Sequence, residues 1–148
     1  LASTFERLGQ YENARDLYET VLAQNPEIEP AVNNLAMLLS DQFESPENLQ
    51  RALTLSTRFS ESSQPYFVDT YGWVQYKLGN YEDARKAIEL AVENGNDIPV
   101  FHYHLGLVYK ALEMNEQAEN HLILAERLAQ EQDDQALLNQ INEHLSQN

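Results

Sequence analysis

A stretch near the start of the chain, Leu8-Gly9-Gln10-Tyr11-Glu12-Asn13-Ala14-Arg15, occurs again as Leu78-Gly79-Asn80-Tyr81-Glu82-Asp83-Ala84-Arg85. The two copies share six of eight residues at a shift of 70. A second set of matches lies 34 residues apart and pairs Pro65 with Pro99, Gly72 with Gly106, and Ala84 with Ala118. The sequence therefore indicates an internal repeat with a period of 34 residues, and the shift of 70 equals two periods plus two residues.

The two surplus residues are expected in the middle unit of the repeat. There the stretch Asp41-Gln42-Phe43-Glu44-Ser45-Pro46-Glu47-Asn48 stands where the other units have a short turn. We expect this stretch to form a lengthened loop between two helices.

Local patterns favour helices throughout the chain. Leu35, Leu38 and Leu39 follow the spacing of an amphipathic helix. Only five glycines and five prolines interrupt 148 residues, which favours long helices over many short strands. The predicted helix pairs are Ala2–Leu8 with Tyr11–Ala23, Pro30–Leu39 with Pro46–Phe59, Pro65–Leu78 with Tyr81–Glu93, and Pro99–Leu112 with Glu116–Gln130. A last helix, with Leu137, Leu138, Ile141 and Leu145 on one face, is expected to cap the stack.

The repeat resembles the tetratricopeptide repeat, which has a 34-residue period with small residues and a Gly-x-aromatic turn at fixed positions. Gly72 and Gly106 match one small position, Gly79 and Tyr81 match the turn, and Ala84 matches the next small position. The fourth unit departs from the pattern, since Glu113 and Asn115 stand where glycine and an aromatic residue belong. The resemblance implies an all-α, right-handed α-solenoid of helix-turn-helix repeats.

In that register the chain is expected to form a single domain of about three and a half repeats. The expected divisions are a partial repeat over 1–28, a repeat with the lengthened loop over 29–64, repeats over 65–98 and 99–130, and a capping helix over 131–148. The small residues of the repeats are expected to be packing positions: Gly72, Gly106, Ala84, Ala118, Ala91 and Ala125. Because the chain begins with Leu1, we expect it to be a piece of a longer protein.

The resemblance also implies a concave surface formed by the first helix of each pair, where a partner would bind. The expected contact residues are Asn33, Asn34 and Met37 in the second unit, Tyr66, Asp69, Thr70, Trp73, Tyr76 and Lys77 in the third, and Tyr103, His104, Leu107 and Lys110 in the fourth. Aromatic residues and Met are enriched at protein interfaces, and the Asn side chains can donate to and accept from an extended peptide. The alternative is that Trp73, Tyr76 and Tyr66 only pack between helices.

A specialised version of this surface is not expected. Some tetratricopeptide domains hold the acidic C-terminus of chaperones with a clamp of Lys, Asn and Arg side chains on three first helices. Asn34 matches one Asn of that pattern, but Tyr66 and Thr70 stand where the clamp requires basic residues.

Composition argues against several other functions. The formal net charge of -15 would repel nucleic acid and anionic lipid, and no apolar run is long enough to span a membrane. The absence of cysteine excludes cysteine-ligated metals and thiol nucleophiles. His102 and His104 lie two residues apart, on different faces of a helix, so sharing a metal with His121 is awkward. We therefore expect no catalytic residue, no cofactor and no metal.

These observations predict a non-catalytic scaffold that binds a peptide or partner protein in its concave groove, within a bacterial multiprotein assembly. The alternative is a purely structural spacer or oligomerisation module of a larger, enzymatic envelope protein, with self-association through the solenoid ends. The motifs Val32–Ala36, Val68–Val74 and Phe101–Gly106 resemble the closing repeats of bacterial proteins of exopolysaccharide export and envelope protein sorting. That resemblance implies a periplasmic, envelope-associated location, with a cytoplasmic location as the alternative.

Overall fold

The computed structural model describes residues 1–146, which form nine α-helices, one short 3₁₀ helix and no strand. The last two residues of the predicted capping segment, 147–148, lie outside the described residues. The helices are α1 (Ala2–Arg7), α2 (Tyr11–Gln24), α3 (Glu29–Gln42), α4 (Pro46–Ser56), η1 (Thr57–Phe59), α5 (Pro65–Lys77), α6 (Tyr81–Asn94), α7 (Pro99–Ala111), α8 (Asn115–Glu131) and α9 (Gln135–Ser146). Within these residues no helix is both long and apolar enough to cross a membrane.

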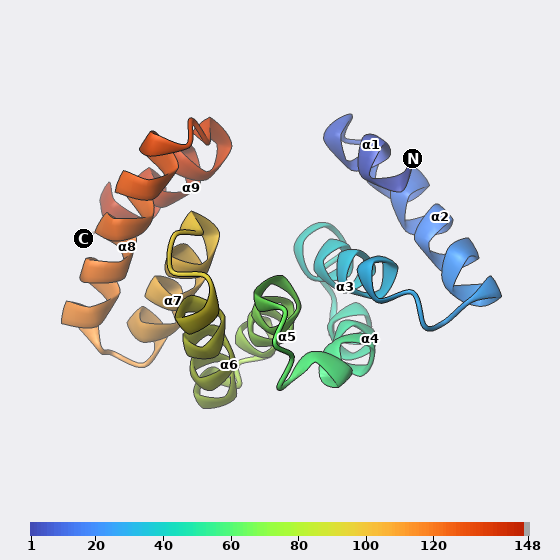
Figure 1. Ribbon diagram of the computed structural model, residues 1–148, viewed down its shortest axis with the longest axis horizontal. Coiled ribbons are helices and arrows are strands. Elements are labelled where there is room, and N and C mark those ends of the chain that lie inside the picture. Colours follow the sequence, from blue (N-terminus) through green and yellow to red (C-terminus); the bar gives the residue numbers. More distant parts are fainter. Residues whose placement is uncertain (147–148) are drawn as a thin grey trace.

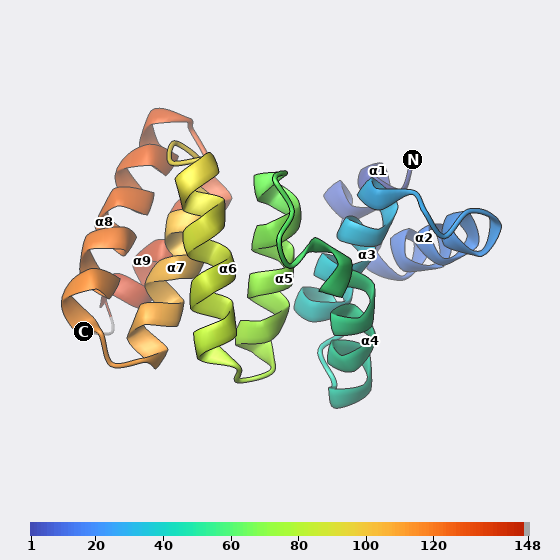
Figure 2. The same cartoon turned by 60° about the horizontal axis from the view of Figure 1, so that its bottom comes forward.

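The helices follow one another in antiparallel pairs that together form an arch (Figure 1). The first helices of the pairs, α3, α5 and α7, lie toward the inside of the arch, and α4, α6 and α8 lie outside them. Figure 2 shows the same pairs side by side along the chain. Helix α9 comes after the outer helix α8 and returns to the inner side of the arch, beside α7. The inner surface is therefore made by α3, α5, α7 and α9.

Prolines and left-handed turn residues set where these helices begin and end. Pro65 and Pro99 occupy first-turn positions of α5 and α7, where a missing N–H costs no helical hydrogen bond. The turn after α5 contains Gly79 with a φ of 85°, and the corresponding turn after α7 contains Glu113 with a φ of 61°. Glycine adopts this left-handed region without steric cost, whereas glutamate does not.

The predicted lengthened loop is wrong. Helix α3 extends to Gln42 and α4 begins at Pro46, so the turn spans 43–45, as short as the turns over 78–80 and 112–114. One surplus residue lies in α3, which has 14 residues where α5 and α7 have 13. The other lies between the starts of α4 and α5, where the interval is 19 residues (65 − 46) against 18 (99 − 81) from α6 to α7. The short 3₁₀ helix η1 lies in that longer interval.

Small residues let the paired helices approach closely, as the repeat pattern predicts. Ala84, Ala91 and Ala125 are completely buried. A Cβ atom added to Gly72 would lie 2.5 Å from Cγ1 of Ile88, and one added to Gly106 would lie 2.8 Å from Cγ of Leu122. These separations are shorter than carbon–carbon contact distances. The two glycines therefore set the spacing between α5 and α6 and between α7 and α8.

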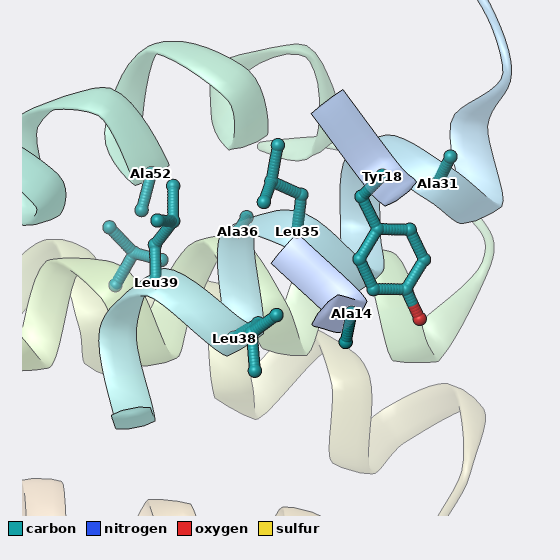
Figure 3. Packing of buried hydrophobic residues seen from close by; sticks show 9 residues of the cluster. Ala14, Tyr18, Ala31, Leu35, Ala36, Leu38, Leu39 and Ala52 are labelled. Atoms are coloured by element: carbon teal, nitrogen blue, oxygen red, sulfur yellow. The ribbon is translucent and has the colours of Figure 1, made fainter. Parts of the chain in front are cut away.

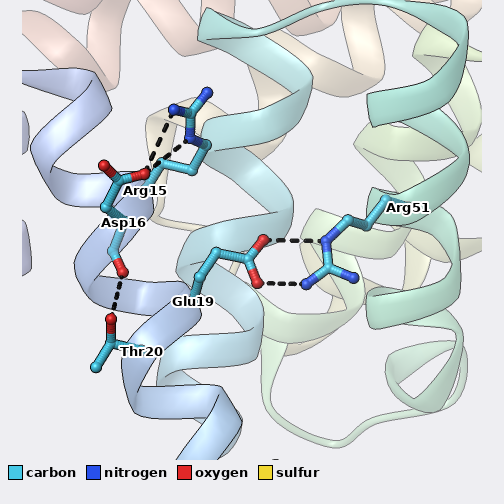
Figure 4. Close-up of polar contacts among 5 residues, drawn as sticks. All are labelled: Arg15, Asp16, Glu19, Thr20 and Arg51. Carbon is cyan, nitrogen blue, oxygen red and sulfur yellow. Dashed lines mark hydrogen bonds and ion pairs between the residues drawn. The ribbon is translucent and has the colours of Figure 1, made fainter.

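The N-terminal half has its own core, centred on α3. Leu35 and Leu39 are essentially inaccessible to solvent, and they pack with Ala14 and Tyr18 of α2 and with Ala52 of α4 (Figure 3). On the surface, both guanidinium nitrogens Nε and Nη2 of Arg51 donate to the carboxylate of Glu19, at 3.1 and 2.6 Å (Figure 4). This ion pair joins α2 to α4, but pairs in such exposed positions contribute little to stability.

Candidate functional site

A pocket of about 470 Å³ lies on the inner surface, bounded by side chains of α3, α5, α7 and α9. Its walls combine apolar and aromatic side chains with a few polar ones, which is the composition typical of ligand sites. The lining residues are Met37, Asp41, Gln42, Trp73, Tyr76, Lys77, Val100, Tyr103, His104, Leu107, Gln140 and His144.

Trp73 forms the floor of this pocket and is only 7% exposed. Its indole ring stacks on the ring of His104, with centroids 4.0 Å apart, and on the ring of Tyr76 at 5.0 Å. The indole Nε1–H donates to Oδ1 of Asp41 at 2.8 Å. Trp73 is thereby fixed by residues of three inner helices, and its polar group is satisfied, as a buried indole requires.

Beneath the floor, His104 is paired with a buried carboxylate. Its Nδ1 lies 3.0 Å from both Oδ1 and Oδ2 of Asp69, so an N–H at this nitrogen donates between the two oxygens. Both side chains are only 5% exposed. The Asp69 carboxylate thus fixes the orientation of the imidazole, which in turn supports the ring of Trp73.

Charged groups at the rim are partly balanced within the protein. The ammonium group of Lys77 lies 5.3 Å above the ring of Trp73 and 3.4 Å from the carboxylate of Glu44. Burial, with the charge of Lys110 adding to it, holds the pKa of His144 below its usual range. Burial also raises the pKa of Tyr103 to about 12, so this phenol remains a neutral hydrogen-bonding group at pH 7.

The pocket brings together seven of the residues expected on the concave surface. They are Met37, Trp73, Tyr76, Lys77, Tyr103, His104 and Leu107. Asp69 lies behind the pocket wall, against His104. Thr70 is buried and its hydroxyl donates to the carbonyl oxygen of Tyr66 at 3.0 Å.

Four of the expected residues lie apart from this pocket. Tyr66 is 52% exposed and its ring meets that of Phe101 edge-on. Asn33 and Asn34 are half-buried neighbours on α3, joined by a hydrogen bond of 3.2 Å. Lys110 is half-buried near the end of α7 and lines a separate hollow with Leu145.

Five lining residues were not predicted from the sequence: Asp41, Gln42, Val100, Gln140 and His144. Asp41 stands four residues after Met37, so an α3 extended past Leu39 would have placed both on one face. Gln140 and His144 are also four residues apart on α9, where only the apolar face was interpreted, as a cap.

The other histidines form a separate pair on the side of α7 that meets α8. Nδ1 of His102 lies 3.0 Å from Nδ1 of His121, and Nε2 of His102 lies 2.7 Å from the carbonyl oxygen of Asn96. The carbonyl requires an N–H at Nε2, so Nδ1 of neutral His102 accepts a hydrogen bond from His121. Within residues 1–146, no group of three or more His, Cys, Asp or Glu side chains is placed to hold a metal ion.

Comparison with protein families gives two matches to tetratricopeptide repeat models, over residues 1–27 and 72–136. Together the two matches cover more than half of the chain. This chain belongs to the tetratricopeptide repeat family. Proteins of this family are generally non-catalytic scaffolds for protein–protein interaction, which agrees with the general class of function predicted from the sequence.

Solved structures show the same tetratricopeptide fold. TTC0263, a thermophilic tetratricopeptide repeat protein of Thermus thermophilus, superposes with a TM-score of 0.74 at 20% identity, over 95% of this chain and 77% of that one. MamA of Desulfovibrio magneticus RS-1, from residue 41 to its end, gives a TM-score of 0.69 at 19% identity, over 89% and 73%. A further MamA structure covers 99% of this chain and 91% of its own, with a TM-score of 0.65 at 15% identity.

These matches confirm the predicted all-α solenoid. A search of the curated proteins found no match.

Proposed function

We propose that this chain is a non-catalytic scaffold that binds a peptide segment of a partner protein on its inner surface, at the pocket over Trp73. The pocket itself carries the proposal, because it joins an apolar floor to polar side chains from four different helices. A volume of about 470 Å³ is sufficient for one or two side chains of an extended peptide.

The architecture of the pocket supports binding rather than simple packing. The floor is held in place from below by the Asp69–His104 pair and from the side by Asp41, so little order is lost when a ligand arrives. Gln42 and Gln140 are exposed at its edge, where their amide groups can pair with a peptide backbone. Preorganised aromatic floors of this kind are where binding energy concentrates in protein interfaces.

Filling the pocket provides the test, because it leaves the core residues in place. Peptides selected by display against the wild-type protein are measured against Gln140→Trp, which inserts an indole into the pocket. Asn142→Trp is the matched control, since Asn142 is exposed on the same helix α9 but on another face. We expect selected peptides to lose binding to Gln140→Trp only. Equal binding to both variants would show that the pocket is not used.

The alternative function, a structural spacer that associates through its ends, rests on a different surface. Near the N-terminal end an apolar hollow of about 440 Å³ is lined by Leu17, Val21 and Ile28, and Leu1 and Leu8 are 80% and 65% exposed. A spacer of this kind would sediment as a dimer, and Ile28→Glu would return it to the monomer. Gln140→Trp would leave that equilibrium unchanged.

A further inference from the structure

We propose that the pocket takes a cationic side chain, lysine or arginine, from a basic segment of the partner. This inference rests on the proposed peptide-binding function and specifies which class of peptide binds. It is carried by the Asp41 carboxylate, by the aromatic rings around it, and by the way the protein already places one of its own ammonium groups there.

Asp41 provides an oriented carboxylate at the pocket. It lies in the last turn of α3 and its side chain is exposed. Oδ1 accepts the indole N–H of Trp73, which fixes the carboxylate in the pocket lining, and Oδ2 has no hydrogen bond within residues 1–146. Such an oxygen is suited to a charge-assisted hydrogen bond from an ammonium or guanidinium group.

The aromatic rings provide a surface for the alkyl stem and the charge of the same side chain. Tyr76 and Tyr103 line the pocket beside Trp73. Lys77 shows that this surface accepts a cation, since its Nζ lies 5.3 Å from the centroid of the Trp73 ring. Cations within about 6 Å of an aromatic ring are attracted by its quadrupole. A ligand cation reaching Asp41 would pass along the same group of rings.

The surrounding charges also favour a cationic ligand. Among the described residues that line the pocket, Lys77 is the only lysine or arginine, and its charge is already opposed by Glu44 at 3.4 Å. His144 does not add a competing charge at pH 7, because burial keeps its pKa low. The chain as a whole carries -15, so it attracts basic segments and repels acidic ones before contact.

The helix ends act in the same direction. Asp41 and Gln42 lie in the last turn of α3, and Tyr76 and Lys77 lie in the last turn of α5. The C-terminal end of a helix carries a partial negative charge from its unpaired carbonyl groups. Two such ends border the pocket, and they contribute to a potential that stabilises a bound cation.

The test uses three fluorescein-labelled peptides with one framework, Ser-Leu-X-Tyr-X-Ala-Ser, in which X is Arg, Gln or Glu. Fluorescence anisotropy with the wild-type protein is expected to rank them Arg above Gln above Glu. Asp41→Asn retains an oxygen that can accept the Trp73 N–H and removes only the charge. We expect it to weaken binding of the Arg peptide by about tenfold and to leave the Gln peptide unchanged.

Two further variants separate pocket binding from general attraction. Asp83→Asn removes the same charge from an exposed position on the outer helix α6, and we expect no more than about a twofold change. Tyr76→Leu keeps apolar bulk but removes one aromatic face, and it is expected to weaken the Arg peptide more than the Gln peptide. Circular dichroism confirms that each variant is folded.

Each outcome decides one of the two proposals. Equal effects of Asp41→Asn and Asp83→Asn, or no binding of the Arg peptide, would overturn the cation proposal. If the selected peptides depend on the pocket, as judged with Gln140→Trp, but are apolar or acidic, the scaffold function stands and the cation proposal fails. If Gln140→Trp has no effect on any peptide, both proposals fail.

Discussion

Helix α7 meets its two neighbours with different histidine chemistry. Toward α5, in the preceding repeat, His104 is paired with the carboxylate of Asp69, and both are buried. Toward α8, within its own repeat, His102 faces a second histidine, His121. One contact joins a base to an acid and the other joins two bases. The same residue type, two positions apart on one helix, therefore has opposite electrostatic surroundings.

The difference follows from what each contact has to position. The pair with Asp69 continues through the stacked ring of Trp73 to Asp41, and it links α7, α5 and α3 across three repeats. The pair of His102 with His121 is local and is held by the Asn96 carbonyl. We infer that the first contact fixes the inner surface and the second fixes only the α7–α8 pair.

The largest effect is expected from breaking the acid–base contact. His104→Leu removes the hydrogen-bond donor and leaves the Asp69 carboxylate buried without a partner. Breaking a buried pair in this way costs about 3–5 kcal/mol. Urea denaturation followed by circular dichroism measures this loss in the free energy of unfolding.

A second substitution distinguishes the missing partner from the missing ring. Asp69→Leu combined with His104→Leu removes both polar groups, and we expect it to regain a large part of the lost stability. A double variant as unstable as His104→Leu alone would mean that stacking on Trp73, not the carboxylate, accounts for the loss.

A smaller loss is expected from crowding the α7–α8 contact. Gly106→Ala places a methyl group 2.8 Å from Cγ of Leu122, so one helix has to shift. Overpacking of this kind costs about 1–3 kcal/mol. Thermal melting of Gly106→Ala is compared with that of Gly106→Ala combined with Leu122→Val, which makes room for the methyl group. Additive losses in the double variant would contradict the predicted clash.

The histidine pair is expected to make stability depend on pH. Burial, and secondly the neighbouring His102, lower the pKa of His121, although Glu89 acts in the opposite direction. The unfolded chain, with a histidine pKa of about 6.5, then binds more protons than the folded one. The free energy of unfolding therefore falls as pH decreases from about 7 toward 5, by at most about 1.4 kcal/mol per pH unit for one group.

Variants identify which histidine causes this dependence. His144 has a lowered pKa as well and contributes with the same sign, so His121→Gln and His144→Gln are measured separately by urea denaturation at pH 7 and pH 5. His121→Gln should reduce the slope. An unchanged slope in both variants would show that carboxylates, rather than these histidines, govern the acid response.

The sequence predicted the repeat scaffold well because its cause is local and periodic. Gly72, Gly106 and Ala84 recur at a fixed spacing, since each packs against the partner helix of its own pair. The pocket was only half predicted, because it depends on where elements end. Asp41 was assigned to a loop, and Gln140 and His144 were assigned to a cap. Neither the inward return of α9 nor the pairing of His104 with Asp69 leaves a periodic signal.

The smallest effect is expected at the turn between α7 and α8, where the departure from the repeat pattern is visible in the sequence. Glu113 stands where the repeat pattern has glycine, and it is held at a φ of 61°. A side chain in this region costs about 1–2 kcal/mol, part of which is offset because glycine gains more entropy on unfolding. We therefore expect Glu113→Gly to stabilise the protein by up to about 1 kcal/mol in thermal melting. Glu113→Ala retains a Cβ atom and should bring no such gain, so equal stabilisation by both variants would assign the effect to the removed charge.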